Sequence, residues 1–141
     1  MKESRSLFIS LCFLCLLLTG CGGTSDSGPA VYPVTGTVSL DGEPIPEGAM
    51  VFLDPEGKGK SFGARIENGQ YSTEMTPGKK KVEITATRTS ETKMEPGPSG
   101  GPPVPATEQY IPPQYNTETT LEIEVSPDDA NTFPFDLKTG Q

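Results

Sequence analysis

Residues 34–52 read VTGTVSLDGEPIPEGAMVF, and this stretch decides the fold. Over 34–40, apolar or small residues alternate with Thr and Ser, the period of two that a half-buried β-strand shows. Asp and Gly at 41–42 supply a turn, and residues 49–53 supply a second strand-like run. Ile45 lies between two prolines, so we expect it to close one edge of the core where the chain crosses over. The stretch predicts two strands joined by turns.

The same alternation of apolar and polar residues recurs in five later segments: 62–67, 71–75, 81–87, 121–125 and 133–137. Asn68-Gly69 favours a hairpin, because a type I′ turn needs positive φ at both central residues. Gly (16) and Pro (15) are abundant, as expected for many turns between short strands. No segment has a convincing helical pattern. We therefore predict an all-β fold, a single seven-stranded β-sandwich.

The alternation stops after Arg88. Residues 89–109 contain EPGPSGGPPVP, which has few apolar side chains to bury and several prolines that cannot donate to a β-ladder. We expect a long Pro/Gly-rich loop at 89–109, either a decoration or a contact surface. The segment 110–115, YIPPQY, is expected to pack on the sandwich.

Residues 1–20 have the zones of an export signal. Lys2 and Arg5 are followed by an uninterrupted apolar run at 7–18. At about 1.5 Å per residue this run reaches about 18 Å, short of the roughly 30 Å hydrocarbon core of a membrane. We therefore expect a cleaved signal peptide rather than a permanent transmembrane helix.

Leu18, Thr19, Gly20 and Cys21 resemble the bacterial lipobox, an apolar residue and two small residues before a cysteine. The resemblance implies cleavage before Cys21 and lipidation of its sulfur, with acyl chains that attach the protein stably to a membrane. The alternative is an ordinary secretory signal in which Cys21 is incidental. Small polar residues follow, so we expect a flexible tether over 21–30 and a domain over 31–138.

The envelope is the compartment that this signal implies. Gly22 follows the cysteine, where an aspartate would resemble an inner-membrane retention signal, so the outer membrane is favoured over the inner membrane. The formal net charge of −8 disfavours nucleic acid as a partner. The partners expected are the membrane, through the lipid, and an envelope protein or polysaccharide.

Catalytic groups are scarce. Cys12 and Cys15 lie in the expected signal peptide and Cys21 is the expected lipid site, which leaves no free thiol in the mature chain. The sequence also has no His, so the commonest acid–base and nucleophilic groups are missing. We expect no enzyme, no catalytic residue and no cofactor, although composition leaves a Ser–Lys dyad open.

Two clusters are candidates for binding. Asp128, Asp129 and Asn131 could offer oxygen ligands to calcium, although a polar turn that caps its own backbone is the alternative we favour. Tyr110 and Tyr115 could stack on a sugar ring, although such residues more often close the end of a sandwich. No metal site is expected beyond the calcium candidates.

Residues 34–52 also resemble the opening of carboxypeptidase regulatory-like domains, with their G-x-V, D-G-x-P-[apolar] and G-A-x-V pattern. Residues 68–72 (NGQYS) and 77–82 (PGKKKV) resemble the family's later D-G-x-[YF] … P-G-x-[YH]-x-[VL] signature. Asn68 replaces the usual Asp, and Lys80 stands where an aromatic residue is common.

The resemblance covers about residues 31–137, and its C-terminal part is similar to small bacterial lipoproteins built on this domain. It implies a transthyretin-like (prealbumin-like) sandwich of the kind that acts as an accessory, adhesive or spacer module. We thus expect a non-catalytic, membrane-anchored envelope lipoprotein that acts as a structural module or binds a protein or polymer. The alternative is a calcium- or carbohydrate-binding β-sandwich module.

Overall fold

A computed structural model describes residues 28–140. The predicted signal peptide, the lipobox, Cys21 and the first part of the tether lie outside the described residues. The described part contains eleven strands and two short 3-10 turns. Their bounds in chain order are β1 (Tyr32–Leu40), β2 (Glu43–Pro44), β3 (Glu47–Leu53), β4 (Phe62–Glu67), β5 (Gln70–Met75), β6 (Gly78–Thr85), β7 (Thr87–Glu95), η1 (Pro98–Gly100), β8 (Val104–Gln109), η2 (Pro113–Tyr115), β9 (Glu122–Val125), β10 (Asn131–Thr132) and β11 (Phe135–Leu137).

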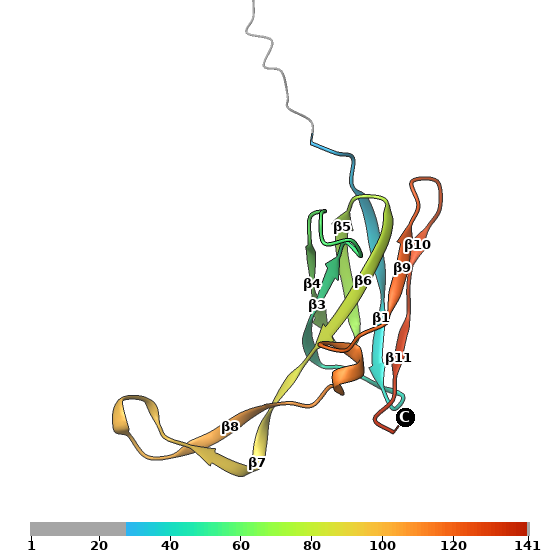
Figure 1. Ribbon diagram of the computed structural model, residues 1–141. Coiled ribbons are helices and arrows are strands. Elements are labelled where there is room, and N and C mark those ends of the chain that lie inside the picture. Colours follow the sequence, from blue (N-terminus) through green and yellow to red (C-terminus); the bar gives the residue numbers. More distant parts are fainter. Residues whose placement is uncertain (1–27, 141) are drawn as a thin grey trace, which may run out of the picture.

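Nine of these strands form one sheet, with the order β10-β1-β5-β4-β3-β6-β9 and with β2 and β11 also paired to β1. All pairs are antiparallel except those that join β10 and β11 to β1. The sheet curls around the core, while β7 and β8 form a separate two-stranded sheet that leaves the body (Figure 1). The prediction of an all-β fold is confirmed.

The local turn chemistry also agrees with the sequence. Asn68 and Gly69 have φ values of 52° and 74°, the left-handed pair that the predicted hairpin between β4 and β5 needs. Asp41 and Gly42 repeat this geometry between β1 and β2. Ile45, which the sequence predicts to close one edge of the core, is 1% exposed.

Two expectations differ from the structure. The predicted loop at 89–109 is wrong for most of its length, because β7 and β8 pair there and only residues 96–103 connect them. Thr87 to Thr89 pair with Gln109 to Thr107, and their β-forming side chains outweigh the prolines beyond them. The described residues also contain more strand segments than seven. The predicted last strand, 133–137, begins two residues later in the structure, as β11, and a further short strand, β10, precedes it.

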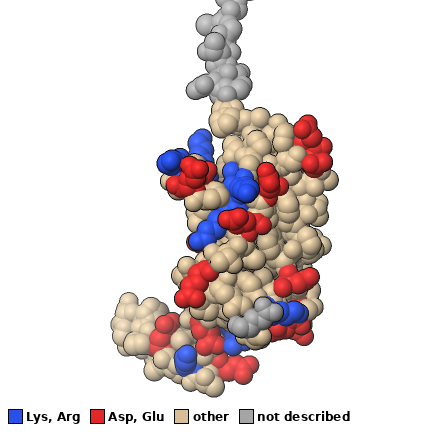
Figure 2. Space-filling model, turned by 45° about the vertical axis from the view of Figure 1, so that its right-hand side comes forward, with Lys and Arg blue, Asp and Glu red and all other residues tan. Residues whose placement is uncertain are grey.

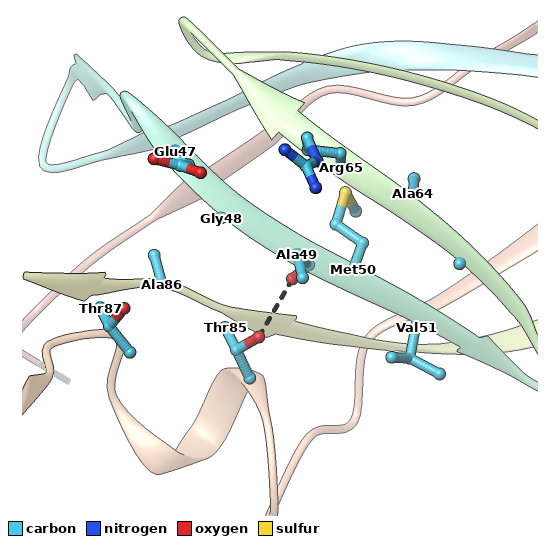
Figure 3. Close-up of a pocket in the computed structure, with 11 residues that line it drawn as sticks. Glu47, Gly48, Ala49, Met50, Val51, Ala64, Arg65, Thr85, Ala86 and Thr87 are labelled. Carbon is cyan, nitrogen blue, oxygen red and sulfur yellow. Dashed lines mark hydrogen bonds between the residues drawn. The ribbon is translucent and has the colours of Figure 1, made fainter.

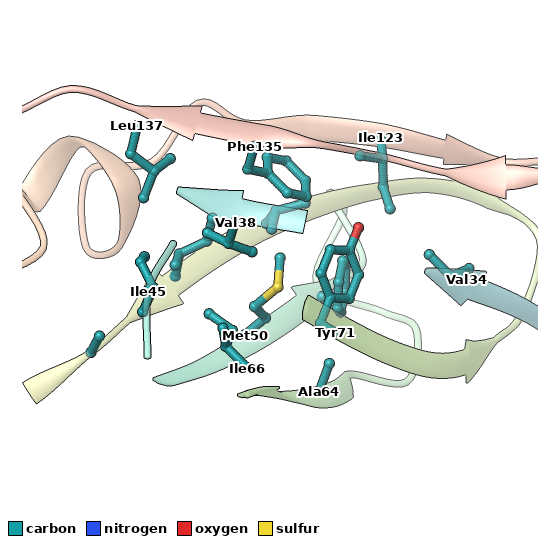
Figure 4. Close-up of a cluster of buried hydrophobic side chains, with 14 of the residues drawn as sticks. Val34, Val38, Ile45, Met50, Ala64, Ile66, Tyr71, Ile123, Phe135 and Leu137 are labelled. Carbon is teal, nitrogen blue, oxygen red and sulfur yellow. The ribbon is translucent and has the colours of Figure 1, made fainter. Parts of the chain in front are cut away.

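The inward side chains of the curled sheet point toward one another and form one core (Figure 4). Tyr71 lies at its centre, with ring centroids 6.0 Å from Phe52 and 6.1 Å from Phe135. The Tyr71 hydroxyl donates a hydrogen bond of 2.9 Å to the carbonyl of Phe133, and burial raises the pKa of this phenol. Because the Tyr71 hydroxyl keeps a hydrogen-bond acceptor, burying it costs little free energy, and the ring can fill the centre of the core.

Opposite charges face each other along the outer side of β6 and β9. Lys79 lies opposite Glu124, and Lys81 lies opposite Glu122. Such cross-strand pairs favour this register by a few tenths of a kcal/mol each, roughly. Figure 2 shows acidic and basic side chains intermingled on one face of the body. Lys80 lies opposite Ile123, on the inner side of the sheet, and is only 4% exposed. Its position in a run of three lysines does not predict this burial.

Residues 28–140 include no helix that is long and apolar enough to cross a membrane.

We predict that Ile123→Asp destabilises the fold by more than about 3 kcal/mol, because a carboxylate would enter the core without a partner. Ile123 is 7% exposed and belongs to the core cluster. Urea denaturation followed by circular dichroism measures the loss. Glu124→Ala on the same strand is the control and should change stability by less than about 0.5 kcal/mol, since Glu124 is exposed. Equal stability of the two variants would contradict the described orientation of β9.

Candidate binding site: the β7–β8 ribbon and the cleft at its base

β7 and β8 form an antiparallel ribbon that runs sideways from one end of the body (Figure 1). Residues 28–31, which precede β1, lie at the opposite end. The ribbon pairs at five register positions and is interrupted between Thr89 and Met94, so Ser90 to Lys93 have no partners in β8. A two-stranded ribbon without a third strand or a covering layer is only marginally stable in water. The body must therefore hold its base.

The side chain of Gln109 provides that attachment. Its Oε1 accepts hydrogen bonds from the backbone N–H groups of Ala86 at 3.0 Å and Ile111 at 3.2 Å. Ala86 and Ile111 are 3% and 2% exposed, so these N–H groups have little access to water. The N–H of Tyr110 also donates to the carbonyl of Ala86 at 3.2 Å. The strand thus bends at Ala86, between β6 and β7, without leaving these two N–H groups unpaired.

A small ionic cluster lies on the ribbon just beyond this attachment. The Arg88 Nε donates to Glu108 Oε1 at 3.1 Å, and the Lys93 Nζ lies 3.8 Å from Glu108 Oε2. The hydrogen bond from Arg88 is the main reason that the pKa of Glu108 lies below its usual value. The Arg88 guanidinium also lies over the Tyr110 ring, 5.4 Å from its centroid, a distance at which cation–π attraction operates.

A cleft of about 430 Å³ lies where the ribbon meets the body. Its walls come from the β1–β2 turn, the start of the ribbon and the C-terminal segment, with Asp41, Glu43, Arg88, Tyr110 and Thr139 as the polar lining. Asp41 accepts hydrogen bonds from the hydroxyl and the N–H of Thr139, and these bonds lower the pKa of its carboxyl group. The cleft therefore combines an aromatic ring with groups of both charges.

The two predicted tyrosines have different positions. Tyr110 lines the cleft, with one side of its ring covered by Arg88. Tyr115 belongs to η2, packs against the core, and accepts a 3.0 Å hydrogen bond from the N–H of Lys138. The structure does not bring the rings together as one platform. Burial raises the pKa of Tyr110, partly offset by Arg88.

The calcium candidates lie in the turn between β9 and β10. Asn131 is 7% exposed, and its side-chain amide closes this turn by accepting a hydrogen bond from the Ser126 N–H and donating one to the Ser126 carbonyl, both at 2.9 Å. Its oxygen already has a partner, whereas Asp128 and Asp129 are exposed. Within residues 28–140, no three His, Cys, Asp or Glu side chains are grouped as metal ligands.

Residues 90–93 read SETK, the S-x-x-K spacing of some serine hydrolases. In this ribbon the Ser90 Oγ accepts a 3.1 Å hydrogen bond from the backbone N–H of Lys93, while the Lys93 ammonium lies near Glu108. The lysine amine is thus directed to a carboxylate, and the serine stabilises the irregular part of β7. Within residues 28–140, no hydrogen bond joins the Lys93 amine to the Ser90 hydroxyl.

A second hollow, of about 720 Å³, lies over the outer side of β3, β4 and β6 (Figure 3). Small residues such as Gly48, Ala49 and Gly63 form much of its floor, and Glu47 and Arg65 border it. The Thr85 hydroxyl donates to the carbonyl of Ala49 at 3.3 Å inside this hollow. It is an open sheet surface with few convergent polar groups, unlike a ligand pocket.

The far part of the ribbon exposes apolar side chains. Met94 is 60% exposed and Val104 is 36% exposed, and they occupy neighbouring register positions opposite Pro105 and Glu95. In the described residues, the only other large hydrophobic side chain exposed to this degree is Val31. Arg88, Gln109 and Met94 were not predicted as site residues. The Thr-Arg-Thr alternation at 87–89 was the available signal, but the neighbouring prolines obscured it.

No family model matches the chain, and no curated protein matches it. Two solved structures are similar at 13% sequence identity. The crystal structure of a DUF3823 family protein from Parabacteroides merdae ATCC 43184 has a TM-score of 0.39, over 79% of this chain and 46% of that chain. The crystal structure of a 9R-lipoxygenase from Cyanothece PCC8801 has a TM-score of 0.33, over 77% of this chain and 16% of that chain. The chain thus spans less than half the length of either protein.

We predict that Gln109→Leu loosens the ribbon and leaves the body folded. Two nearly inaccessible N–H groups would lose their acceptor, at a cost of about 2 kcal/mol. Hydrogen exchange should become faster in β7 and β8 and remain slow in the core strands β1 and β5. Gln70→Leu is the matched control, because Gln70 is exposed on β5. Unchanged exchange in the ribbon of the Gln109 variant would show that the ribbon is held by other contacts.

We also predict that Arg88→Gln raises the pKa of Glu108 toward 4.5, its ordinary value. A carboxyl group with a depressed pKa in the folded protein stabilises the fold above its unfolded pKa, and this contribution is lost as the pH falls through the folded pKa. The base of the ribbon should therefore loosen in acid, below about pH 4. An NMR titration of the Glu108 carboxyl carbon in both proteins measures the shift. Identical midpoints would mean that Arg88 does not contact Glu108 in solution.

Proposed function

We propose that the protein is a non-catalytic lipoprotein of the cell envelope, in which a transthyretin-like β-sandwich holds the β7–β8 ribbon away from a membrane. The ribbon would contact a protein or polymer of the envelope. The resemblance of residues 34–52 to carboxypeptidase regulatory-like domains supports the finer fold assignment. The lipobox-like residues 18–21 support the anchor.

One observation carries the binding role. The ribbon leaves the body at the end opposite to residues 28–31, through which the chain would reach its anchor (Figure 1). A lipid at Cys21 would therefore place the ribbon on the side of the domain that faces away from the membrane surface. The exposed Met94 and Val104 near its far end are the kind of surface that marks an interaction site.

The calcium and sugar alternatives have weaker support from the geometry. Asn131 uses both amide atoms to close its own turn. Tyr110 has Arg88 over its ring, and Tyr115 is bonded to the backbone of Lys138. A non-catalytic role is favoured by the lack of His in the sequence and by the structural use of Ser90 and Lys93.

The anchor predicts that Cys21→Ser moves the protein from the membrane fraction to the soluble fraction of cells that produce the full chain. Mass spectrometry of the wild-type N-terminal peptide should show a diacylglycerol on the Cys21 sulfur. Cys15→Ser is the matched control and should leave both results unchanged, because it lies in the expected signal peptide. A wild-type peptide that begins elsewhere, or that has an unmodified cysteine, would refute the anchor.

A further inference from the structure

We propose that the β7 edge of the ribbon pairs with β7 of a second copy of this chain, so that two ribbons form one intermolecular sheet around a two-fold axis. The proposal deepens the proposed function, because it names a partner for the ribbon and rests on both copies sharing a membrane. The charges of β7, the interruption of its ladder with β8 and the direction of the ribbon are the observations that lead to it.

The charge pattern of β7 is self-complementary. Arg88, Glu91, Lys93 and Glu95 alternate in sign along the strand. Consider an antiparallel pair in which Thr92 faces Thr92 of the second copy. Glu91 of each copy then lies opposite Lys93 of the other copy, so two pairs of opposite charge form, one on each side of the axis. Opposite charges and paired threonines both favour such cross-strand contacts. β7 contains no proline, so every residue of the strand has an N–H group that can enter a ladder.

The ladder between β7 and β8 is interrupted at the same place. Ser90 to Lys93 have no register partner in β8, and the N–H of Lys93 donates to the hydroxyl of Ser90. Thr92 lies in the middle of this stretch and is exposed. Pairing with a second β7 would turn a two-stranded ribbon, which is marginally stable alone, into a four-stranded sheet, which exceeds the three strands that an independently stable sheet needs.

The direction of the ribbon suits two copies on one membrane. Two identical chains anchored in one membrane are related by an axis along the membrane normal. The ribbon runs sideways from the body rather than continuing its long axis (Figure 1), so this axis would place two ribbons side by side and antiparallel. A common membrane also raises the effective concentration, which lets a small interface suffice.

The test places a cysteine at the expected axis. Thr92→Cys in the full chain, oxidised in isolated membranes, should give a covalent dimer of twice the chain mass, because residues that face each other across such an axis are within disulfide reach. Thr120→Cys, an exposed threonine on the body, is the matched control and should stay monomeric. The wild-type chain controls for its native cysteines.

Charge exchange tests the register. In the Thr92→Cys background, Glu91→Lys and Lys93→Glu should each lower the dimer yield about fivefold, because like charges then face each other. The double exchange should restore the yield to within about twofold. The double variant also loses the contact between Lys93 and Glu108, so hydrogen exchange in β7 and β8 is measured beside the yield. A double variant whose ribbon exchanges like the wild type but whose dimer yield stays low would overturn the register.

Other outcomes are equally decisive. No adduct at position 92, or an adduct whose mass includes a different protein, would overturn pairing between copies. Fractionation of the same samples reports on the anchor separately. Chain recovered in the soluble fraction would contradict the proposed function, whereas a membrane-bound chain that stays monomeric would contradict only the pairing.

Discussion

The close approach of the C-terminal segment to β1 is the contact on which the rest of the sheet depends. A Cβ at Gly36 would overlap the carbonyl oxygen of Phe133, so only glycine lets this backbone lie beside β1. The same carbonyl accepts the hydroxyl of Tyr71, while the Phe133 N–H donates to Thr35 at 2.9 Å. One carbonyl thus links the edge of the sheet to the ring at the centre of the core.

This contact also explains why the last strand is divided. β10 and β11 pair with β1 in one continuous register, but the ladder is missing at Phe133 and Pro134. Proline has no N–H to donate, and the Phe133 carbonyl is directed to Tyr71 rather than along the ladder. Phe135 then returns to the core and contacts the ring of Tyr71. The alternation of Phe133, Phe135 and Leu137 predicts strand character there, and Pro134 is the one sign of the break in the sequence.

Local patterns predicted the parts of the fold that local forces decide. Periods of two located the main-sheet strands, and Asn68-Gly69 located a hairpin, because turn geometry depends on the two residues that form it. The inward position of Lys80 depends instead on its register opposite Ile123, and the bend at Ala86 depends on the distant side chain of Gln109. The sequence also placed Tyr110 and Tyr115 in one short segment. Only the packing of the chain shows that one lines a cleft while the other supports the core.

The ribbon is where local and tertiary forces oppose each other most clearly. Residues 96–103 contain the glycines and prolines that predict a loop, and they do form the irregular connection. The strands on either side persist because the body holds the ends nearest to it through Gln109, Tyr110 and Ala86. Cross-strand pairing then extends outward from this base. Pairing is interrupted between Thr89 and Met94 and resumes at the far end, where Met94 and Val104 are exposed. The order of the ribbon therefore depends on the residues at its base, whereas the proposed pairing depends on residues 90–93, which have no register partner in β8.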